Sequence, residues 1–171
     1  MPEDNPVFLV DPYSSPVAVR ITGRASFQNV VPLKEFLKSS YATGKRDFVF
    51  DFSLCSGMDS TVLGVLAGCA LELRRLEPKG SLVLSRLSDR NLELVKNLGL
   101  HRIATVDTGN GAAESGGGGA TTALSAKQLN ELENARLCLE AHENLVAADS
   151  ENQEKFQDVI AYLKNRVEDE A

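Results

Sequence analysis

The sequence predicts an α/β fold with a mixed β-sheet, followed by a helical extension. Strand-like and helix-like segments alternate over residues 1–107, and two strands precede the first helix. A glycine-rich stretch then interrupts the apolar periodicity, and the patterns beyond it are helical. Alternation of strands and helices favours a partly parallel sheet covered by helices, whereas two strands joined by a short turn pair antiparallel. The expected order of the first part is ββαβαβαβ.

The first two strands are expected to form an antiparallel hairpin. Residues 7–10 and 17–21 are rich in apolar and β-branched side chains, and a turn rich in proline, serine and aspartate joins them. That turn is too short for a crossover helix. Pro32 suits the first turn of a helix that ends near Gly44. The apolar face of this helix consists of Leu33, Phe36 and Leu37.

The remaining elements of this part follow in order. Residues 48–52 are aromatic and β-branched and predict a buried strand. A helix with apolar residues at helical spacing begins near Ser60. A strand at residues 81–84 leads into a helix that Asp89 is expected to cap. Residues 103–106 predict a short strand at the edge of the sheet.

The chain divides into an α/β domain at residues 1–107, a flexible glycine-rich linker at 108–122 and a two-helix extension at 123–171. Capping-box patterns that begin at Ser125 and Ser150 predict the two helix starts. We expect the helices to pack in cis, and a homodimer contact or a partner-binding arm is the alternative. The second helix carries an apolar stripe that should be buried in the free protein: Phe156, Val159, Ile160, Leu163 and Val167.

Composition excludes several classes of function. A net charge of -6 argues against binding a nucleic-acid backbone through bulk electrostatics. Cys55, Cys69 and Cys138 are odd in number and far apart, as expected of reduced thiols in the cytoplasm. His101 and His142 have no third ligand nearby in sequence, so neither a metal site nor a catalytic constellation is predicted. No signal peptide and no segment of membrane-spanning length is visible, and no cofactor is expected.

The junction between the strand at residues 48–52 and the next helix is the most informative part of the chain. Asp59, Ser60 and Thr61 stand where the helix begins. Backbone N–H groups at a helix start lack intrahelical partners, and the helix dipole there favours negative charge. A phosphate on Ser60 or Thr61 would therefore lie in a favourable field. Asp59 or Ser60 also suits the common role of a helix cap, and an exposed cap hydroxyl can be a phosphoacceptor as well.

This junction resembles the STAS domain family, to which bacterial anti-sigma factor antagonists belong. The family pattern is an acidic strand end, a short loop, and Asp-Ser-Ser/Thr-Gly-Leu-Gly at a helix start. Residues 59–64 read Asp-Ser-Thr-Val-Leu-Gly, with Asp51 at the strand end. The glycine that closes the early strand, the strand beginning at residue 80 and the turn at 98–100 extend the resemblance over roughly residues 7–107. Val62 replaces the usual motif glycine.

The resemblance implies a STAS-like fold and a non-enzymatic module of transcription regulation. Such a module would bind an anti-sigma factor or a related serine kinase with an ATP-binding domain. The position of the family's phosphorylated hydroxyl corresponds to Ser60. Arg24 stands where the family often carries an acidic residue after the strand glycine. The implied partner-binding residues are Gly23, Arg24, Asp59, Ser60, Thr61, Val62, Leu63 and Gly64.

Two alternatives differ in class from this hypothesis. One is a STAS scaffold or transporter-associated interaction module that is never phosphorylated, which Val62 and the extra helices favour. The other is a response-regulator receiver, because residues 8–11 and 49–51 look like its acidic strand ends. A receiver needs clustered carboxylates for Mg²⁺ and a lysine beside the phosphate. Here Asp11 precedes Pro12, and the first two strands leave no room for a helix, so the sequence favours the STAS fold.

Overall fold

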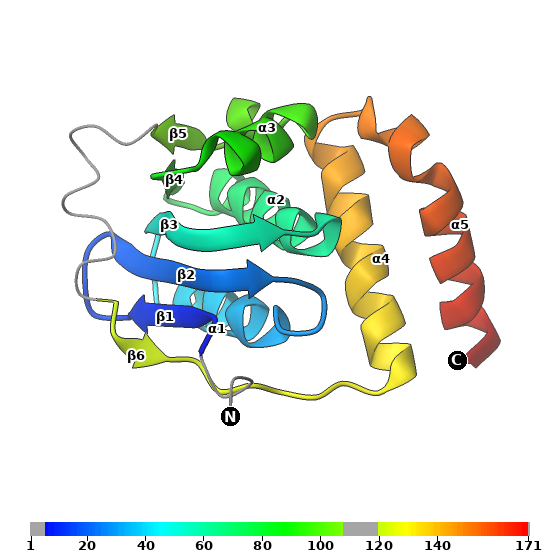
Figure 1. Ribbon diagram of the computed structural model, residues 1–171, viewed down its shortest axis with the longest axis horizontal. Helices are drawn as coiled ribbons and strands as arrows, with labels where there is room; N and C mark the ends of the chain where they lie inside the picture. The colour runs from blue at the N-terminus through cyan, green and yellow to red at the C-terminus, as the bar shows by residue number, and fades with distance from the viewer. Residues whose placement is uncertain (1–5, 108–119, 171) are drawn as a thin grey trace.

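The computed structural model describes residues 6–107 and 120–170, which form one mixed sheet with helices packed against it (Figure 1). The sheet has six strands in the order β5-β4-β3-β2-β1-β6. Strand β1 is antiparallel to β2 and β6, whereas β2, β3, β4 and β5 are mutually parallel. The strands are β1 (Phe8–Asp11), β2 (Val17–Ala25), β3 (Asp47–Met58), β4 (Ser81–Ser85), β5 (Thr105–Asp107) and β6 (Thr122–Ala123).

This topology confirms the predicted α/β class and the mixed sheet. Val10 of β1 lies opposite Val19 of β2, which in turn lies opposite Phe50 of β3. The antiparallel hairpin of β1 and β2 excludes the receiver alternative, because a receiver joins its first two strands through a helix. Asp11 has a local role instead, since its carboxylate accepts the backbone N–H of Tyr13 within the turn at 3.1 Å.

The main apolar core lies between the sheet and helices α1 and α2, which run behind the sheet in Figure 1. Phe48, Phe50 and Phe52 on β3 are fully buried, as their aromatic and β-branched run predicts. The opposite face carries a smaller cluster around Val49 and Ala120. The helices are α1 (Val31–Ala42), α2 (Ser60–Arg75), α3 (Asp89–Asn97), the short 3₁₀ helix η2 (Leu100–Arg102), α4 (Glu131–Ala148) and α5 (Asn152–Glu170).

Three predicted helix starts were wrong in detail. The side chain of Ser88, not Asp89, caps α3 by accepting the N–H of Asn91. Helix α4 begins at a capping box between Asn130 and Glu133, and not at Ser125. Ahead of α5, which begins at Asn152, the carboxylate of Asp149 accepts the N–H of Glu151, and Asp149 directly precedes the predicted cap. At α3 and α5 the error arises because adjacent short polar side chains can all accept a free N–H group. At α4 the cap, Asn130, lies well beyond Ser125 in the sequence.

The strand at the second edge of the sheet, β6, was not predicted. Strand β6 pairs with β1, with Ala123 opposite Leu9, so the chain returns to the sheet before it enters α4. Two residues carry too little periodicity to be recognised as a strand. The linker predicted for residues 108–122 lies mostly outside the described residues, and the division of the chain at residue 107 stays a prediction.

The C-terminal helices form the expected cis hairpin, in which α4 crosses α2 and α5 packs on α4 (Figure 1). The prediction that the apolar stripe of α5 is buried was wrong in degree. Phe156, Ile160, Leu163 and Val167 are only half-buried, and Val159 is 41% exposed. The reason is that α5 packs mainly against one helix, which covers one side of the stripe. Among the described residues, no helix combines the length and hydropathy needed to cross a membrane.

Candidate functional site

Asp59 fixes the start of α2 through two separate hydrogen bonds. Its Oδ1 accepts the N–H of Val62 at 3.0 Å, which makes it the N-cap. Its Oδ2 accepts the N–H of Phe27 at 2.9 Å, in the loop that follows β2. One carboxylate therefore satisfies a free N–H of the helix and ties the helix start to the end of β2. Of the two capping candidates in the sequence, the structure selects Asp59.

Ser60 is the first residue of α2, and its hydroxyl is hydrogen-bonded to a histidine of α4. The Ser60 Oγ lies 2.9 Å from Nε2 of His142. The Nδ1 of the same ring lies 2.6 Å from the backbone carbonyl oxygen of Cys138. A carbonyl oxygen only accepts, so Nδ1 carries a proton, and in the neutral ring Nε2 then accepts the hydroxyl hydrogen of Ser60. The His142 side chain is 5% exposed, and its ring packs edge-on against Phe156 at 4.9 Å between centroids.

His142 is the residue of this site that sequence reasoning missed. It lies 82 positions from Ser60, beyond the glycine-rich stretch, and no local pattern links the two. A usable signal was the spacing of Cys138 and His142, four residues apart, which places them on one face of a helix. Both side chains face the start of α2, since Thr61 Oγ1 lies 3.6 Å from Cys138 Sγ.

The packing of α4 on α2 is close enough to require small residues. A Cβ added at Gly64 would overlap the backbone carbonyl of Ala141. A Cβ added at Gly68 would lie 2.5 Å from the side-chain amide nitrogen of Asn144. That amide donates to the carbonyl oxygen of Gly64 at 3.3 Å. Gly64 therefore lets the two helix backbones approach each other, Gly68 leaves room for the Asn144 side chain, and α4 lies directly over the first turns of α2.

The implied partner-binding residues are not all on one surface. Thr61 is 4% exposed, and Val62 and Leu63 belong to the main core with 0% and 1% exposure. Gly23 and Arg24, at the end of β2, are exposed. The structure thus brings the end of β2 beside Asp59 and half-buried Ser60, while the next turn of α2 faces either the sheet or α4.

The joint between α4 and α5 is fastened to the corner formed by α3 and η2. The Asn152 amide donates to the carbonyl oxygens of Leu98, at 2.9 Å, and Leu145, at 2.8 Å, and Asn152 is fully buried. Asp149 pairs with Arg102 at 3.0 Å. These contacts hold the hairpin at the turn that joins α4 to α5.

Asp51, the acidic residue at the predicted strand end, lies inside β3 and is not part of the Ser60 site. Its side chain is 1% exposed and lies 3.6 Å from Nε of Arg20 and 3.9 Å from Nη1 of Arg86. Its Oδ1 also accepts the N–H of Ser53 at 2.9 Å. Burial against two guanidinium groups suits a structural carboxylate. Within residues 6–107 and 120–170, no group of three side chains could ligate a metal ion.

We predict that Asp51 does not accept a phosphoryl group. A buried, ion-paired carboxylate is poorly placed for attack on a small phosphodonor, so incubation with acetyl phosphate and Mg²⁺ should leave the intact mass unchanged. The Asp51→Asn variant is the matched control. A gain in mass that appears in the wild type and vanishes in this variant would contradict the prediction.

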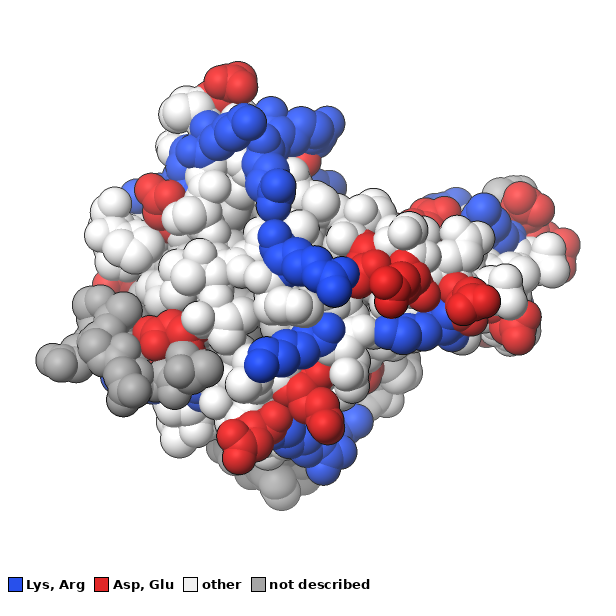
Figure 2. Space-filling model, turned by 90° about the horizontal axis from the view of Figure 1, so that it is seen from above, with Lys and Arg blue, Asp and Glu red and all other residues white. Residues whose placement is uncertain are grey.

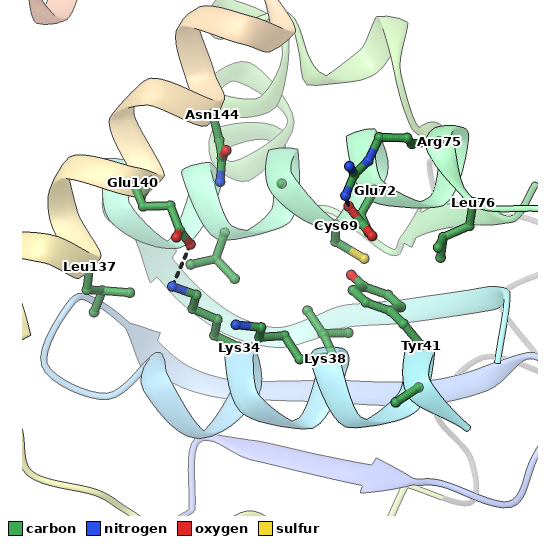
Figure 3. A pocket seen from close by; sticks show the side chains of 15 residues that line it. Lys34, Lys38, Tyr41, Cys69, Glu72, Arg75, Leu76, Leu137, Glu140 and Asn144 are labelled. Atoms are coloured by element: carbon green, nitrogen blue, oxygen red, sulfur yellow. Dashed lines mark hydrogen bonds and ion pairs between the residues drawn. The ribbon is translucent and has the colours of Figure 1, made fainter. Parts of the chain in front are cut away.

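A cavity of about 550 Å³ lies beside the site, between α1, α2 and α4 (Figure 3). Two of its cations are paired across or along its walls, Lys34 with Glu140 at 2.5 Å and Arg75 with Glu72. Tyr41 reaches from α1 toward Cys69 of α2 (Figure 3). Burial raises the pKa of the Cys69 thiol to about 12, so it stays protonated at neutral pH. The cavity shows that α4 is not packed against α1 in this region.

On the face of the molecule seen in Figure 2, several lysine and arginine side chains form a band that runs from the upper edge toward the centre, and acidic side chains lie beside it.

Comparison with known proteins identifies a family whose model matches this chain. A family model described as the Mlab STAS domain matches residues 9–106. Among solved structures, the chain is similar to one titled "Structure of the Anti-Sigma Factor Antagonist SpoIIAA in its Unphosphorylated Form". The identity is 19%, the TM-score is 0.47, and the match covers 52% of this chain and 81% of that chain. None of the curated proteins compared with the chain matches it. Helices α4 and α5 lie beyond the residues that the family model matches.

Proposed function

The chain belongs to the STAS domain family, and we propose that it is a regulatory protein-binding module of the anti-sigma factor antagonist type, switched by phosphorylation of Ser60. The proposed partner is a kinase-type anti-sigma factor or a related serine kinase with an ATP-binding domain. The proposed setting is transcription regulation in a bacterial cytoplasm. The observation that carries the proposal is the position of Ser60, whose hydroxyl stands at the first residue of α2, directly after its N-cap.

The start of α2 suits a phosphate chemically. Free N–H groups of the first turn and the helix dipole favour negative charge at this position, so α2 need not unfold when Ser60 is modified. A phosphate adds about -1.5 to -2 charges. That charge would stand beside the Asp59 carboxylate and repel an acidic or apolar partner surface. Thr61 is the poorer acceptor, because its side chain is 4% exposed and faces Cys138.

Two exposed apolar side chains, one in the loop after β2 and one on β3, extend the proposed partner surface beyond the residues implied by the family pattern. Phe27, whose N–H bonds to Asp59, is 40% exposed. Leu54, on β3 opposite Thr22, is 58% exposed. Aromatic and other large apolar side chains are typical of the buried centre of a protein interface. We therefore add Phe27 and Leu54 to Gly23 and Arg24 as proposed contacts.

We propose binding and not catalysis for the Ser60–His142 pair. The pair has the separation of a nucleophile and a general base. The second nitrogen of His142, however, bonds to a backbone carbonyl and not to a carboxylate, and the Ser60 hydroxyl is partly buried against α4. The pair is better explained as a contact that seats α4 on α2.

A second candidate function is a STAS scaffold or transporter-associated module that is never phosphorylated. The hydrogen bond from Ser60 to His142 favours it, because that bond occupies the hydroxyl. In this alternative the exposed side chains of α5, Val159 at 41% and Tyr162 at 61%, would serve a homodimer or a permanent partner. The two candidates differ in whether a negative charge at position 60 alters binding.

The test is affinity capture from a native lysate of the source cells, with wild-type, Ser60→Ala and Ser60→Asp proteins as baits. We expect the wild type to retain a protein with an ATP-binding kinase domain, and Ser60→Asp to retain roughly tenfold to a hundredfold less. Ser39→Asp, which places the same charge at an exposed position of α1, is the matched control and should behave as wild type. Equal capture by wild type and Ser60→Asp would favour the scaffold.

A further inference from the structure

We infer that α4 is a removable cover over the partner-facing start of α2, and that the C-terminal hairpin must undock before a kinase or a partner can engage Ser60. The inference rests on the proposed function, and it adds the regulation of that site. The hairpin would act as an intramolecular competitor that holds the site closed in the resting protein.

The cover follows from contacts at successive turns of α2. His142 is hydrogen-bonded to the Ser60 hydroxyl, Cys138 lies against Thr61, and the backbone at Ala141 lies against Gly64. Phosphoryl transfer needs the acceptor oxygen in line with the phosphate and its leaving group. With its hydrogen directed to His142 beneath α4, the Ser60 hydroxyl is not open to such an approach.

Uncovering α2 would expose a helix that is already formed. The cap of α2 depends on Asp59 and Phe27, neither of which belongs to α4. The closest contacts of α4 on α2 involve small residues, Thr61, Gly64 and Gly68. The start of α2 would therefore be ready to bind a partner without refolding.

The docking of α4 is tight along α2 but weak on its flank. The cavity of about 550 Å³ separates α4 from α1, and the Lys34–Glu140 pair spans it with side chains that are 27% and 56% exposed (Figure 3). Exposed ion pairs add little stability. On the other hand, Leu137 and Leu145 of α4 are 5% and 0% exposed, so undocking uncovers apolar area and the docked state predominates. This balance fits an element that opens locally as a minor state.

Gly64→Ala is the substitution that should separate α4 from α2 without unfolding α2. Alanine is favourable inside a helix, but its methyl group would overlap the backbone carbonyl of Ala141, which only a displacement of α4 can relieve. Gly68→Ala is the matched control. Its methyl group meets the side-chain amide of Asn144, which can rotate away.

The native thiols report undocking without any partner. Cys138 is half-buried on the face of α4 that meets Thr61, whereas Cys55 is 6% exposed on β3, where it contacts Gly57 and Asn91. We expect N-ethylmaleimide to label Cys138 about tenfold faster or more in full-length Gly64→Ala than in wild type, with Cys55 still protected. Gly68→Ala should stay within about twofold of wild type. An unchanged Cys138 rate, or labelling of Cys138 and Cys55 together, would overturn the inference, because the hairpin would then not be a separable cover.

A locked variant tests the consequence for Ser60. In Thr61→Cys, the new thiol would stand near Cys138, since the present Oγ1 lies 3.6 Å from Sγ. We expect the oxidised, disulfide-locked form to incorporate phosphate at Ser60 about tenfold more slowly than the reduced form in a source-cell lysate with ATP. Wild type under both redox conditions is the control. Equal phosphorylation of both forms would overturn the inference. Failure of Ser60 phosphorylation in every variant, with fast Cys138 labelling in Gly64→Ala, would overturn the proposed switch and support the removable cover.

Discussion

Replacing Asn152 by alanine is expected to lower the free energy of unfolding by about 2–3 kcal/mol. The Asn152 amide is fully buried and donates to the carbonyl oxygens of Leu98 and Leu145. The Leu145 carbonyl keeps the N–H of Asp149 as a partner, so the Leu98 carbonyl bears most of the loss. This loss leaves a buried acceptor away from water at the point where the hairpin is fastened to the α/β domain.

Urea denaturation followed by circular dichroism measures this effect. Asn144→Ala is the matched control, because Asn144 is half-buried and makes one longer bond to a carbonyl inside α2. It should cost about 1 kcal/mol or less. If the two substitutions had equal effects, Asn152 would not be the anchor of the hairpin.

Gly80→Ala is expected to destabilise the protein by about 3 kcal/mol or more. Gly80 lies between α2 and β4, where its N–H bonds to the Leu73 carbonyl oxygen at 2.8 Å. A Cβ at this position would overlap the backbone carbonyl of Arg46, and neither backbone can shift without disturbing the pairing of β3 with β4.

Thermal and urea unfolding of Gly80→Ala and Gly57→Ala distinguish a backbone clash from a side-chain clash. A Cβ at Gly57 would lie 3.2 Å from Nη1 of Arg24, and that exposed side chain can move. Gly57→Ala should therefore change stability by less than about 1 kcal/mol. A Gly80→Ala protein as stable as Gly57→Ala would show that the turn before β4 adjusts freely.

Local features of the sequence were sufficient to predict much of the fold. The short turn before Val17 dictates an antiparallel hairpin, and the aromatic run that contains Phe50 dictates a buried strand. Asp59 was one of two capping candidates, and the choice between them depends on Phe27, which donates to the other carboxylate oxygen. Local sequence patterns thus predict where a helix or strand begins to within a few residues. They do not predict which residue from a distant part of the chain makes a hydrogen bond to that end.

The candidate site could be predicted only in part, because its second half comes from the C-terminal hairpin. Ser60 followed from the resemblance to the STAS family, but the contact with His142 depends on where α4 docks. An apolar period reveals that a helix has a buried face and not what covers it. Gly64 carried the missing information, since glycine inside a helix is unfavourable unless another backbone approaches closely.

Val62 illustrates how a departure from a family pattern can be absorbed by the fold. It replaces the usual motif glycine, yet its side chain is 0% exposed and belongs to the main core. The substitution therefore adds apolar packing between α2 and the sheet and leaves the exposed side of the helix start unchanged. The distinctive feature of this chain is the hairpin that covers the site, which lies outside residues 9–106 matched by the family model.

The most direct test of a phosphorylated, covered Ser60 is phosphopeptide mapping of wild-type and Gly64→Ala proteins purified from the source cells. We expect phosphate on Ser60 and not on Thr61, with a higher fraction modified in Gly64→Ala because the displaced α4 leaves the hydroxyl accessible. Unmodified Ser60 in both proteins, or phosphate on Thr61 instead, would contradict the account.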